Sequence, residues 1–184
     1  MALRITGDPA ADRVLDDDPF ALLLGMLLDQ QYPMEHAFRG PAKLLGRFGT
    51  LDPATIADAD PEEFAALCAR PPAVHRFHGS MAGRIQAAAR LVVSDYGGHA
   101  ERIWTEAGSG AELVERVMGL PGFGRQKAQI FTALLAKQRG VRPAGWEQAV
   151  GDYALDGFRS VADVVDAGSL ERVRAYKKEQ KARG

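Results

Sequence analysis

Residues 118–128, Met-Gly-Leu-Pro-Gly-Phe-Gly-Arg-Gln-Lys-Ala, place two glycines and a proline in a tight turn between two helix-like stretches. Gly122 and Gly124 lack a Cβ atom, so the turn can adopt positive φ angles and leave backbone N–H groups free to donate. Arg125 then begins a helix whose first amides have no partner within the helix, and such amides favour an anion. The spacing predicts a site that binds phosphate. The alternative is a plain helix end followed by a turn, where Gly and Pro also gather.

Charge around this turn favours the phosphate site. Between residues 116 and 142 there is no Asp or Glu, although the net charge of the chain is −1, and the basic residues there are Arg116, Arg125, Lys127, Lys137, Arg139 and Arg142. Acidic residues gather elsewhere, at 16–18 and 52–63, and we place those segments away from the ligand. A nucleic-acid backbone held in this way would be bound through salt-sensitive contacts with little sequence preference.

Helical signals cover most of the chain, and no segment has a convincing strand pattern. Apolar residues recur with a helical period over 82–96 and again after the turn. Breaks are expected at 40–41, 70–72, 97–98 and 142–145, where Gly and Pro cluster. Three segments have the residues of a helix start: Asp18-Pro19, Asp60-Pro61-Glu62-Glu63 and Ser109-Gly110-Ala111-Glu112. The prediction is an all-α protein with about six helices between residues 19 and 140.

Composition agrees with a compact protein that has its own core. The chain has 184 residues, of which 46% are hydrophobic. Its longest strongly apolar run, 20–28, is too short to span a bilayer, and no signal peptide is visible, so a cytoplasmic protein without membrane contact is expected. Cys68 is the single cysteine, which excludes an internal disulfide and a cluster held by four cysteines of this chain.

The Leu-Pro-Gly-Phe-Gly motif resembles the helix-hairpin-helix of the base-excision DNA glycosylases related to endonuclease III, the HhH-GPD family. Two further segments carry the resemblance. Residues 19–31, Pro-Phe-Ala-Leu-Leu-Leu-Gly-Met-Leu-Leu-Asp-Gln-Gln, are similar to the family's first core helix, and residues 75–85, His-Arg-Phe-His-Gly-Ser-Met-Ala-Gly-Arg-Ile, to a loop and the helix after it. The resemblance covers about 19–140. This chain differs from the many members that carry an iron–sulfur cluster, since it has one cysteine.

The resemblance implies a six-helix domain over 19–140, with the helix-hairpin-helix at about 113–139, and a smaller helical lobe formed by 1–18 and 141–184. It also implies that a monomeric protein of this kind binds double-stranded DNA. In the family a side chain fills the hole that a flipped nucleotide leaves in the base stack. By position these residues are Gln31 and Phe77, with His78 as a phosphate contact. Taken without the resemblance, Phe77 could be a core residue, Gln31 a polar helix end and His78 a helix cap.

Hydrolysis of a glycosidic bond passes through an oxocarbenium-like state, which a nearby carboxylate stabilises. The family supplies an Asp shortly after the second helix of the hairpin. Here Glu147 lies nearest that place and Asp152 is the next carboxylate, whereas Asp163 has the spacing of a capping residue. Each could equally be a solvated or capping acid.

Bifunctional members place a lysine two residues after the last glycine of the hairpin, where its amine attacks the sugar. This chain has Gln126 there, and Lys127 follows one residue later, about 100° further around the helix. No strand-cleaving lyase step is therefore expected. The predicted DNA contacts are Gln31, Phe77, His78, Gly122, Gly124, Arg125, Gln126 and Lys127.

No cofactor is expected to be required. In the family a sodium or potassium ion often lies in the hairpin, held by main-chain carbonyls that would belong here to Met118, Leu120 and Phe123. The four histidines lack a convincing ligand spacing for a transition metal.

The interpretation that follows is a monofunctional DNA glycosylase. Its first alternative is a non-catalytic DNA-binding relative that recognises damaged or distorted DNA, and its second is a helical adaptor that uses the hairpin only as a turn. Tyr32, Trp104 and Trp146 are candidates to stack on a flipped base, although most aromatic residues are buried. The basic segment 172–183 could contact DNA or be a solvated helix end.

Overall fold

A computed structural model describes residues 2–184, and no strand is present in that range. The α-helices, in chain order, are α1 (Pro9–Asp17), α2 (Pro19–Leu28), α3 (Met34–Phe48), α4 (Pro53–Asp58), α5 (Pro61–Ala69), α6 (His78–Tyr96), α7 (Arg102–Thr105), α8 (Gly110–Met118), α9 (Arg125–Arg139), α10 (Trp146–Val150) and α11 (Ala167–Arg183). Two short 3-10 helices, η1 (Gly151–Ala154) and η2 (Val161–Asp163), lie between α10 and α11. The all-α prediction is confirmed.

The helix starts read from the sequence are confirmed by their hydrogen bonds. The carboxylate of Asp18 accepts from the N–H groups of Phe20 and Ala21 at the start of α2. Asp60 caps α5 in the same way, and the hydroxyl of Ser109 accepts from the N–H of Glu112 in α8. These caps satisfy amides that would otherwise lack partners.

The break expected at residues 40–41 is wrong, because α3 runs through it. Pro41 lies inside the helix, where it cannot donate to the carbonyl one turn earlier. Gly40 lets α3 approach its neighbours closely: an added Cβ there would lie 2.4 Å from a methyl of Leu28 and 3.3 Å from Val74. Close packing on both sides of Gly40 therefore outweighs the local signal for a break.

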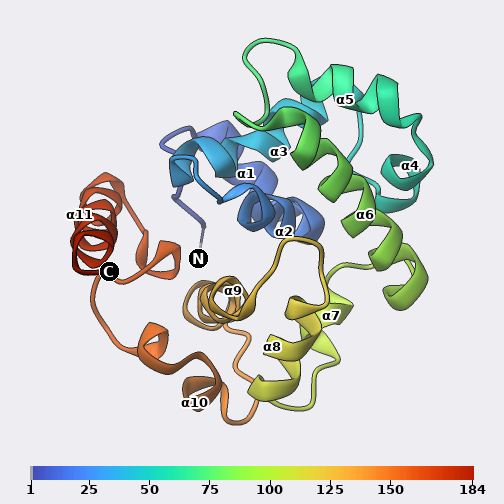
Figure 1. Cartoon of the computed structure of the whole chain (residues 1–184). Coiled ribbons are helices and arrows are strands. Elements are labelled where there is room, and N and C mark those ends of the chain that lie inside the picture. Colours follow the sequence, from blue (N-terminus) through green and yellow to red (C-terminus); the bar gives the residue numbers. More distant parts are fainter. Residues whose placement is uncertain (1) are drawn as a thin grey trace.

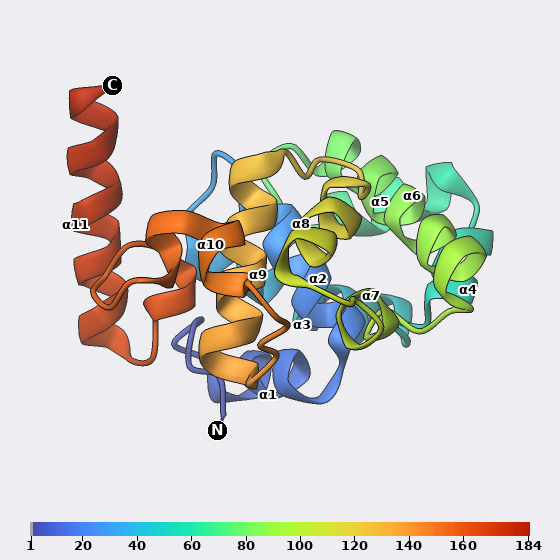
Figure 2. The same cartoon turned by 90° about the horizontal axis from the view of Figure 1, so that it is seen from below.

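The helices surround α2, whose residues 20–28 are all buried. Helices α1 and α3 pack against α2, and α4 and α5 pack on α6 (Figure 1). On the other side α8 and α9 pack against each other and both contact α10, while α11 lies at the edge of the molecule. In Figure 2 the N-terminal end of α9, the N-terminal end of α6 and the C-terminal end of α11 all lie toward the upper edge.

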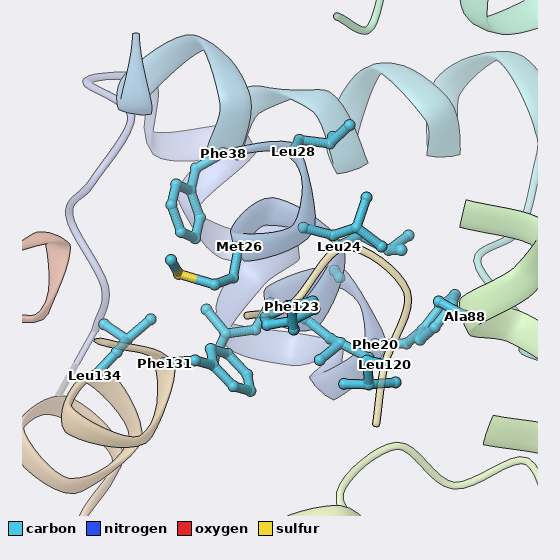
Figure 3. Packing of buried hydrophobic residues seen from close by; sticks show 14 of the residues in the cluster. Phe20, Leu24, Met26, Leu28, Phe38, Ala88, Leu120, Phe123, Phe131 and Leu134 are labelled. Carbon is cyan, nitrogen blue, oxygen red and sulfur yellow. The ribbon is translucent and has the colours of Figure 1, made fainter. Parts of the chain in front are cut away.

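The hairpin between α8 and α9 is anchored by its apolar residues. Leu120 and Phe123 are 3% and 5% exposed and point into the same cluster as Phe20 and Phe131 (Figure 3). The rings of Phe123 and Phe131 meet edge to face with centroids 6.2 Å apart. Burial of these side chains holds the hairpin backbone in one conformation, since each adds about 2 kcal/mol to the hydrophobic stabilisation.

The two terminal segments approach each other. The Arg139 guanidinium of α9 binds the carboxylate of Asp16, 2.9 Å away, and a hollow of about 560 Å³ is lined by residues 2–16 together with 166–170. Helix α11 is tied to α3 by an ion pair between Arg174 and the buried carboxylate of Glu35. These contacts are compatible with the predicted lobe of 1–18 and 141–184, which stays a prediction.

Candidate nucleic-acid interface and active site

The hairpin turns its glycines outward while Leu120 and Phe123 point inward. Gly122 has φ +79°, a conformation that side chains rarely adopt, and Gly124 precedes α9 in an extended conformation. Both glycines are exposed, and their N–H groups donate to no acceptor within residues 2–184. Two free amides therefore stand beside the positive end of α9, an arrangement that suits an anion.

A second exposed loop, residues 29–33, connects α2 to α3. Its Gln31 has φ +50°, the single non-glycine residue of the described chain with a positive φ, and its side chain is exposed. Such a conformation costs about 1 kcal/mol or more and persists only where the surroundings impose it. Arg76 contributes by donating to the carbonyl of Gln31 at 3.3 Å.

Phe77 lies at the start of α6 and is 43% exposed. The guanidinium of Arg76 lies 5.2 Å from the centre of its ring, and the ring of His75 lies 5.7 Å away. The alternative of a core position for Phe77 is therefore wrong. His78 is the first residue of α6; it is exposed, and no side-chain cap is found at this helix start.

His75, which no sequence motif marks as a site residue, connects the 29–33 loop to the start of α6. The ring is fully buried; Nε2 lies 3.0 Å from the carbonyl oxygen of Gln30, and Nδ1 accepts from the N–H of Phe77 at 2.9 Å. These partners assign the proton to Nε2. Burial lowers the pKa of His75, so the neutral ring that fits both partners predominates at neutral pH.

Arg84 of α6 connects the same loop to the hairpin. Its guanidinium donates to the side-chain carbonyl of Gln30 at 2.6 Å. It also lies against the hairpin, because a Cβ added at Gly122 would be 3.3 Å from the Arg84 Nη1 atom. The hairpin, the 29–33 loop and the start of α6 are therefore held as one surface by His75, Arg76 and Arg84.

A pocket of about 620 Å³ lies next to this surface. It is bounded by the end of α2, by the first turns of α9 and by parts of 150–161 and 176–181. Asp29, Gln126, Asp152, Tyr153, Tyr176 and Lys177 line it. The amide of Gln126 donates to the hydroxyl of Tyr153 at 2.8 Å, which joins the hairpin helix to the opposite wall.

Lys127 differs from its predicted role as a surface contact. Its ammonium group donates to the carbonyl of Leu27 at 2.7 Å and lies 5.3 Å from the centre of the Phe123 ring, so the side chain points inward. Burial lowers the pKa of Lys127 to about 8; the charges of Arg84 and Lys177 act in the same direction, and Asp29 opposes them.

The carboxylates suggested for catalysis lie in different surroundings. Asp152 is exposed in η1 and lines the pocket. Glu147 is exposed near the start of α10 and is absent from the pocket wall. Asp163 forms an ion pair with Lys137, 2.7 Å away, and accepts from the N–H of Arg159, so it is structural through these contacts and not through the predicted cap.

The chain matches the model of a known protein family. A family model described as HhH-GPD superfamily base excision DNA repair protein matches residues 24–183. The chain belongs to this family. The match extends past residue 140, where the resemblance of the sequence motifs ended, and includes α10 and α11.

Two solved structures show a limited similarity to this chain. One, a trapped endonuclease III–DNA covalent intermediate, has a TM-score of 0.45 and 16% identity over 71% of this chain. This chain spans 66% of that endonuclease III chain, just under two thirds of it. The other, a thermostable thymine-DNA glycosylase, has a TM-score of 0.44 and 15% identity, with 88% of this chain and 73% of that chain covered. A comparison with curated protein sequences finds no match.

The hairpin carbonyls that HhH-GPD members use for a cation fit that role in part. The carbonyl of Leu120 accepts from the N–H of Phe123 at 3.2 Å, whereas within residues 2–184 the carbonyls of Met118 and Phe123 accept no hydrogen bond. The described residues hold no cluster of three or more His, Cys, Asp or Glu side chains that could bind a metal. Cys68 is buried, which raises its pKa to about 11.

Most cations of the segment 116–142 bind groups of the protein itself, which the sequence pattern did not reveal. The contacts are Arg116 with Glu112, Lys127 with Leu27, Lys137 with Asp163, Arg139 with Asp16 and Arg142 with Ala136, while the exposed Arg125 lies 3.3 Å from Glu115. They fasten α8 and α9 to neighbouring elements. Arg76 and Arg125 are exposed, and Lys177 and Lys181 of α11 line the pocket.

The aromatic residues available to stack on a flipped base also differ from those predicted. Trp104 and Trp146 are both 8% exposed and belong to the core, and Tyr32 packs against His75 with ring centroids 4.6 Å apart. The aromatic residues that face the pocket are Tyr153 and Tyr176.

Within residues 2–184 no helix is both long and apolar enough to cross a membrane.

Proposed function

We propose that the protein is a monofunctional DNA glycosylase that hydrolyses the N-glycosidic bond of a damaged or mispaired base flipped out of double-stranded DNA. One observation carries the proposal: Gly122 and Gly124 are exposed with free amides, and Gln126, two residues after Gly124, lines a pocket of about 620 Å³. A strand held at the hairpin would present a nucleotide to that pocket. Membership of the base-excision repair family supports the same activity.

Binding would begin at the hairpin, where a phosphate oxygen accepts hydrogen bonds from the two glycine amides. Arg125 is exposed beside them and His78 is exposed at the start of α6, so both can reach the neighbouring backbone. A sodium or potassium ion bound by the carbonyls of Met118, Leu120 and Phe123 would add positive charge at the same point. No other cofactor is required by this proposal, and an iron–sulfur cluster is not part of it.

Flipping leaves a gap in the duplex that must be filled. Phe77 can enter the stack, because its ring is exposed and its backbone is fixed through His75. Gln31 can pair with the base left behind, because its strained backbone holds the side chain outside the core. The two residues come from different loops that Arg76 and His75 hold together.

Gln126 supports hydrolysis without strand cleavage. It occupies the position of the nucleophilic lysine of bifunctional members, and an amide cannot form a Schiff base with the sugar. The amine of Lys127 is bound to the carbonyl of Leu27. Asp152, on the pocket wall, is the carboxylate after α9 that can stabilise positive charge on the sugar, and Glu147 is the less suitable candidate because it lies outside the pocket.

A second candidate function is a non-catalytic protein that recognises distorted DNA. It is favoured by the exposure of both Glu147 and Asp152, since a catalytic carboxylate is usually desolvated. In either case we propose a monomer that acts in the cytoplasm, on the nucleoid of a bacterial cell.

The deciding experiment is a panel of duplexes that each carry one damaged or mispaired base, incubated with the wild-type protein and then treated with alkali. Alkali-dependent cleavage at the modified site is expected, and cleavage without alkali is not. Borohydride treatment should trap no covalent complex with abasic DNA; a complex that Lys127→Ala abolishes would refute the monofunctional assignment. Tight binding to a lesion duplex with no abasic product across the panel would favour the non-catalytic function.

A further inference from the structure

We propose that Asp29, at the end of α2, is the carboxylate that activates the hydrolytic water in this pocket. The inference rests on the proposed glycosylase function and names a residue from a part of the chain different from Glu147 and Asp152. It is carried by the position of the carboxylate, by its lack of a protein partner and by the cations around it.

Asp29 is an unusual residue for its place in the fold. It follows directly after nine buried residues of α2, 20–28, and its backbone N–H donates to the carbonyl of Met26. The negative end of a helix disfavours an anion, and burial disfavours it further. Within residues 2–184 the side-chain oxygens of Asp29 accept no hydrogen bond, so that cost is offset by the charges of neighbouring cations and not by hydrogen bonds.

The carboxylate is nevertheless not sealed from solvent. Asp29 is half-buried and lines the pocket together with residues of η1 and α11. Gln126, the residue at the lysine position of bifunctional members, lines the same pocket. A water molecule or a sugar in the pocket could therefore meet Asp29 directly, which is the geometry that a general base needs.

The charges around Asp29 are mostly positive. Burial raises the pKa of Asp29, while Lys177 and Lys127 lower it. The titratable or charged groups of the elements that face it are Lys127 of α9, Asp152 and Tyr153 of η1, Arg159 of the following loop, and Tyr176, Lys177 and Lys181 of α11. A buried carboxylate between cations can be both a stronger base than a surface one and ionised near neutral pH.

The proposed step transfers one proton to Asp29. As the bond between C1′ and the base nitrogen breaks, its electron pair goes to the base, and a bond forms between C1′ and the water oxygen. Asp29 takes the proton that this water loses. The departing base takes up a proton from solvent in the pocket, and Asp29 later returns its own proton to solvent, so that water and nucleotide yield a free base and an abasic sugar.

The experiment compares Asp29→Asn with the wild type on whichever lesion duplex of the panel the wild type opens. Single-turnover excision should fall by about 100-fold or more, as expected when a general base is removed. The control is Asp156→Asn, the same change at an exposed residue outside this pocket, which should excise at the wild-type rate. Affinity for a duplex containing a tetrahydrofuran abasic analogue should change less than threefold in Asp29→Asn.

Two further readouts separate chemistry from a structural role. The melting temperature of Asp29→Asn at neutral pH should equal or exceed that of the wild type, because a neutral amide avoids the burial cost of the charge. Lys127→Met should move the acidic limb of the pH profile for excision to higher pH, because it removes a cation that favours ionised Asp29.

Three results would overturn the inference. Excision by Asp29→Asn within about fivefold of the wild type would assign the base elsewhere and leave the glycosylase function standing. Loss of excision together with a clear fall in melting temperature would make Asp29 a structural residue. Absence of excision by the wild type on every duplex would remove the glycosylase function, and the role of Asp29 with it.

Discussion

Gly122 and Gly124 have different structural requirements although both face outward. At Gly122 the φ of +79° strains any side chain, and a Cβ would also press on Arg84. At Gly124 the φ is −80°, and a Cβ would have no heavy atom within 4 Å. A methyl group at Gly124 would therefore occupy only the space where we place a phosphate, which makes this position a clean test of the hairpin.

Gly124→Ala should leave the free energy of unfolding within about 0.5 kcal/mol of the wild type, as is usual for a surface change. It should weaken binding to duplex DNA by about tenfold, because one displaced charge-assisted contact is worth about 1.4 kcal/mol. Fluorescence anisotropy at fixed salt measures the affinity. The control is Gly46→Ala, an exposed helical position with equally open space. Unchanged DNA affinity in Gly124→Ala would argue against a phosphate at the hairpin.

The lowered pKa of Lys127 makes the free energy of unfolding depend on pH. Its pKa is about 8 in the folded protein against 10.5 for an unperturbed lysine, so the unfolded chain binds more protons between these values. The contribution of Lys127 to the free energy of unfolding is therefore lowest below pH 8 and rises as the pH increases toward 10.5. The pKa difference corresponds to a rise of at most about 3 kcal/mol.

The prediction is measured as a difference between variants, because other groups also titrate at high pH. The free energy of unfolding of the wild type and of Lys127→Met is measured with urea at about pH 7 and at about pH 9.5. The difference between the two proteins should change by about 1–2 kcal/mol in favour of the wild type at the higher pH. Lys178→Met, at an exposed position of α11, should show no such shift. A difference that stays constant with pH would mean that Lys127 is solvated.

At the scale of elements, the sequence predicted the parts of the site that follow from local pattern. Helix caps at Asp18, Asp60 and Ser109 are visible because their partners lie within three residues. The hairpin glycines and the exposed Phe77 also follow from local motifs. His75 and Arg84 were missed because their partners are 45 and 54 residues away, and no spacing in a single sequence marks such a pair.

His75 gives a test of how the elements are joined. His75→Phe keeps an aromatic ring, slightly larger than imidazole, but removes the partners of the Gln30 carbonyl and the Phe77 N–H. Leaving these groups unpaired should lower the free energy of unfolding by about 2–4 kcal/mol. It should also reduce excision or lesion binding, because the 29–33 loop and the start of α6 would no longer be connected.

The control for this prediction is His36→Phe. That histidine is half-buried, and its nearest side-chain donor is Arg39, 3.5 Å away, so a change within about 1 kcal/mol is expected. Thermal unfolding followed by circular dichroism suits both variants. Equal stability of His75→Phe and the wild type would show that water replaces the ring nitrogens and that His75 does not position the site.

At the scale of the whole molecule, the sequence pattern misjudged where the binding charge lies. The segment rich in Lys and Arg predicts a basic surface, yet each of its six cations already contacts a group of the protein. Composition counts charges but cannot show which are already paired. The exposed cations on the hairpin side belong in part to α11, whose C-terminal end lies toward the same edge as the hairpin (Figure 2).

This arrangement predicts that α11 takes part in DNA binding. Lys181 is exposed near the end of α11 and lines the rim of the pocket. Each lysine that binds a phosphate displaces a counterion from the DNA, and removing one such lysine makes the plot of log affinity against log salt shallower by about 0.9. Lys181→Ala should reduce the slope by about that amount and weaken binding to all duplex sequences alike, because phosphate contacts carry no sequence information.

The comparison needs a cation on the opposite side of the molecule. Helix α1 lies toward the other edge in Figure 2 and carries the exposed Arg13, so Arg13→Ala should leave both affinity and slope unchanged. Measurements between 50 and 200 mM salt, on the order of the range where such slopes are resolved, suffice. Equal slopes for Lys181→Ala and the wild type would confine the interface to the hairpin, the 29–33 loop and α6.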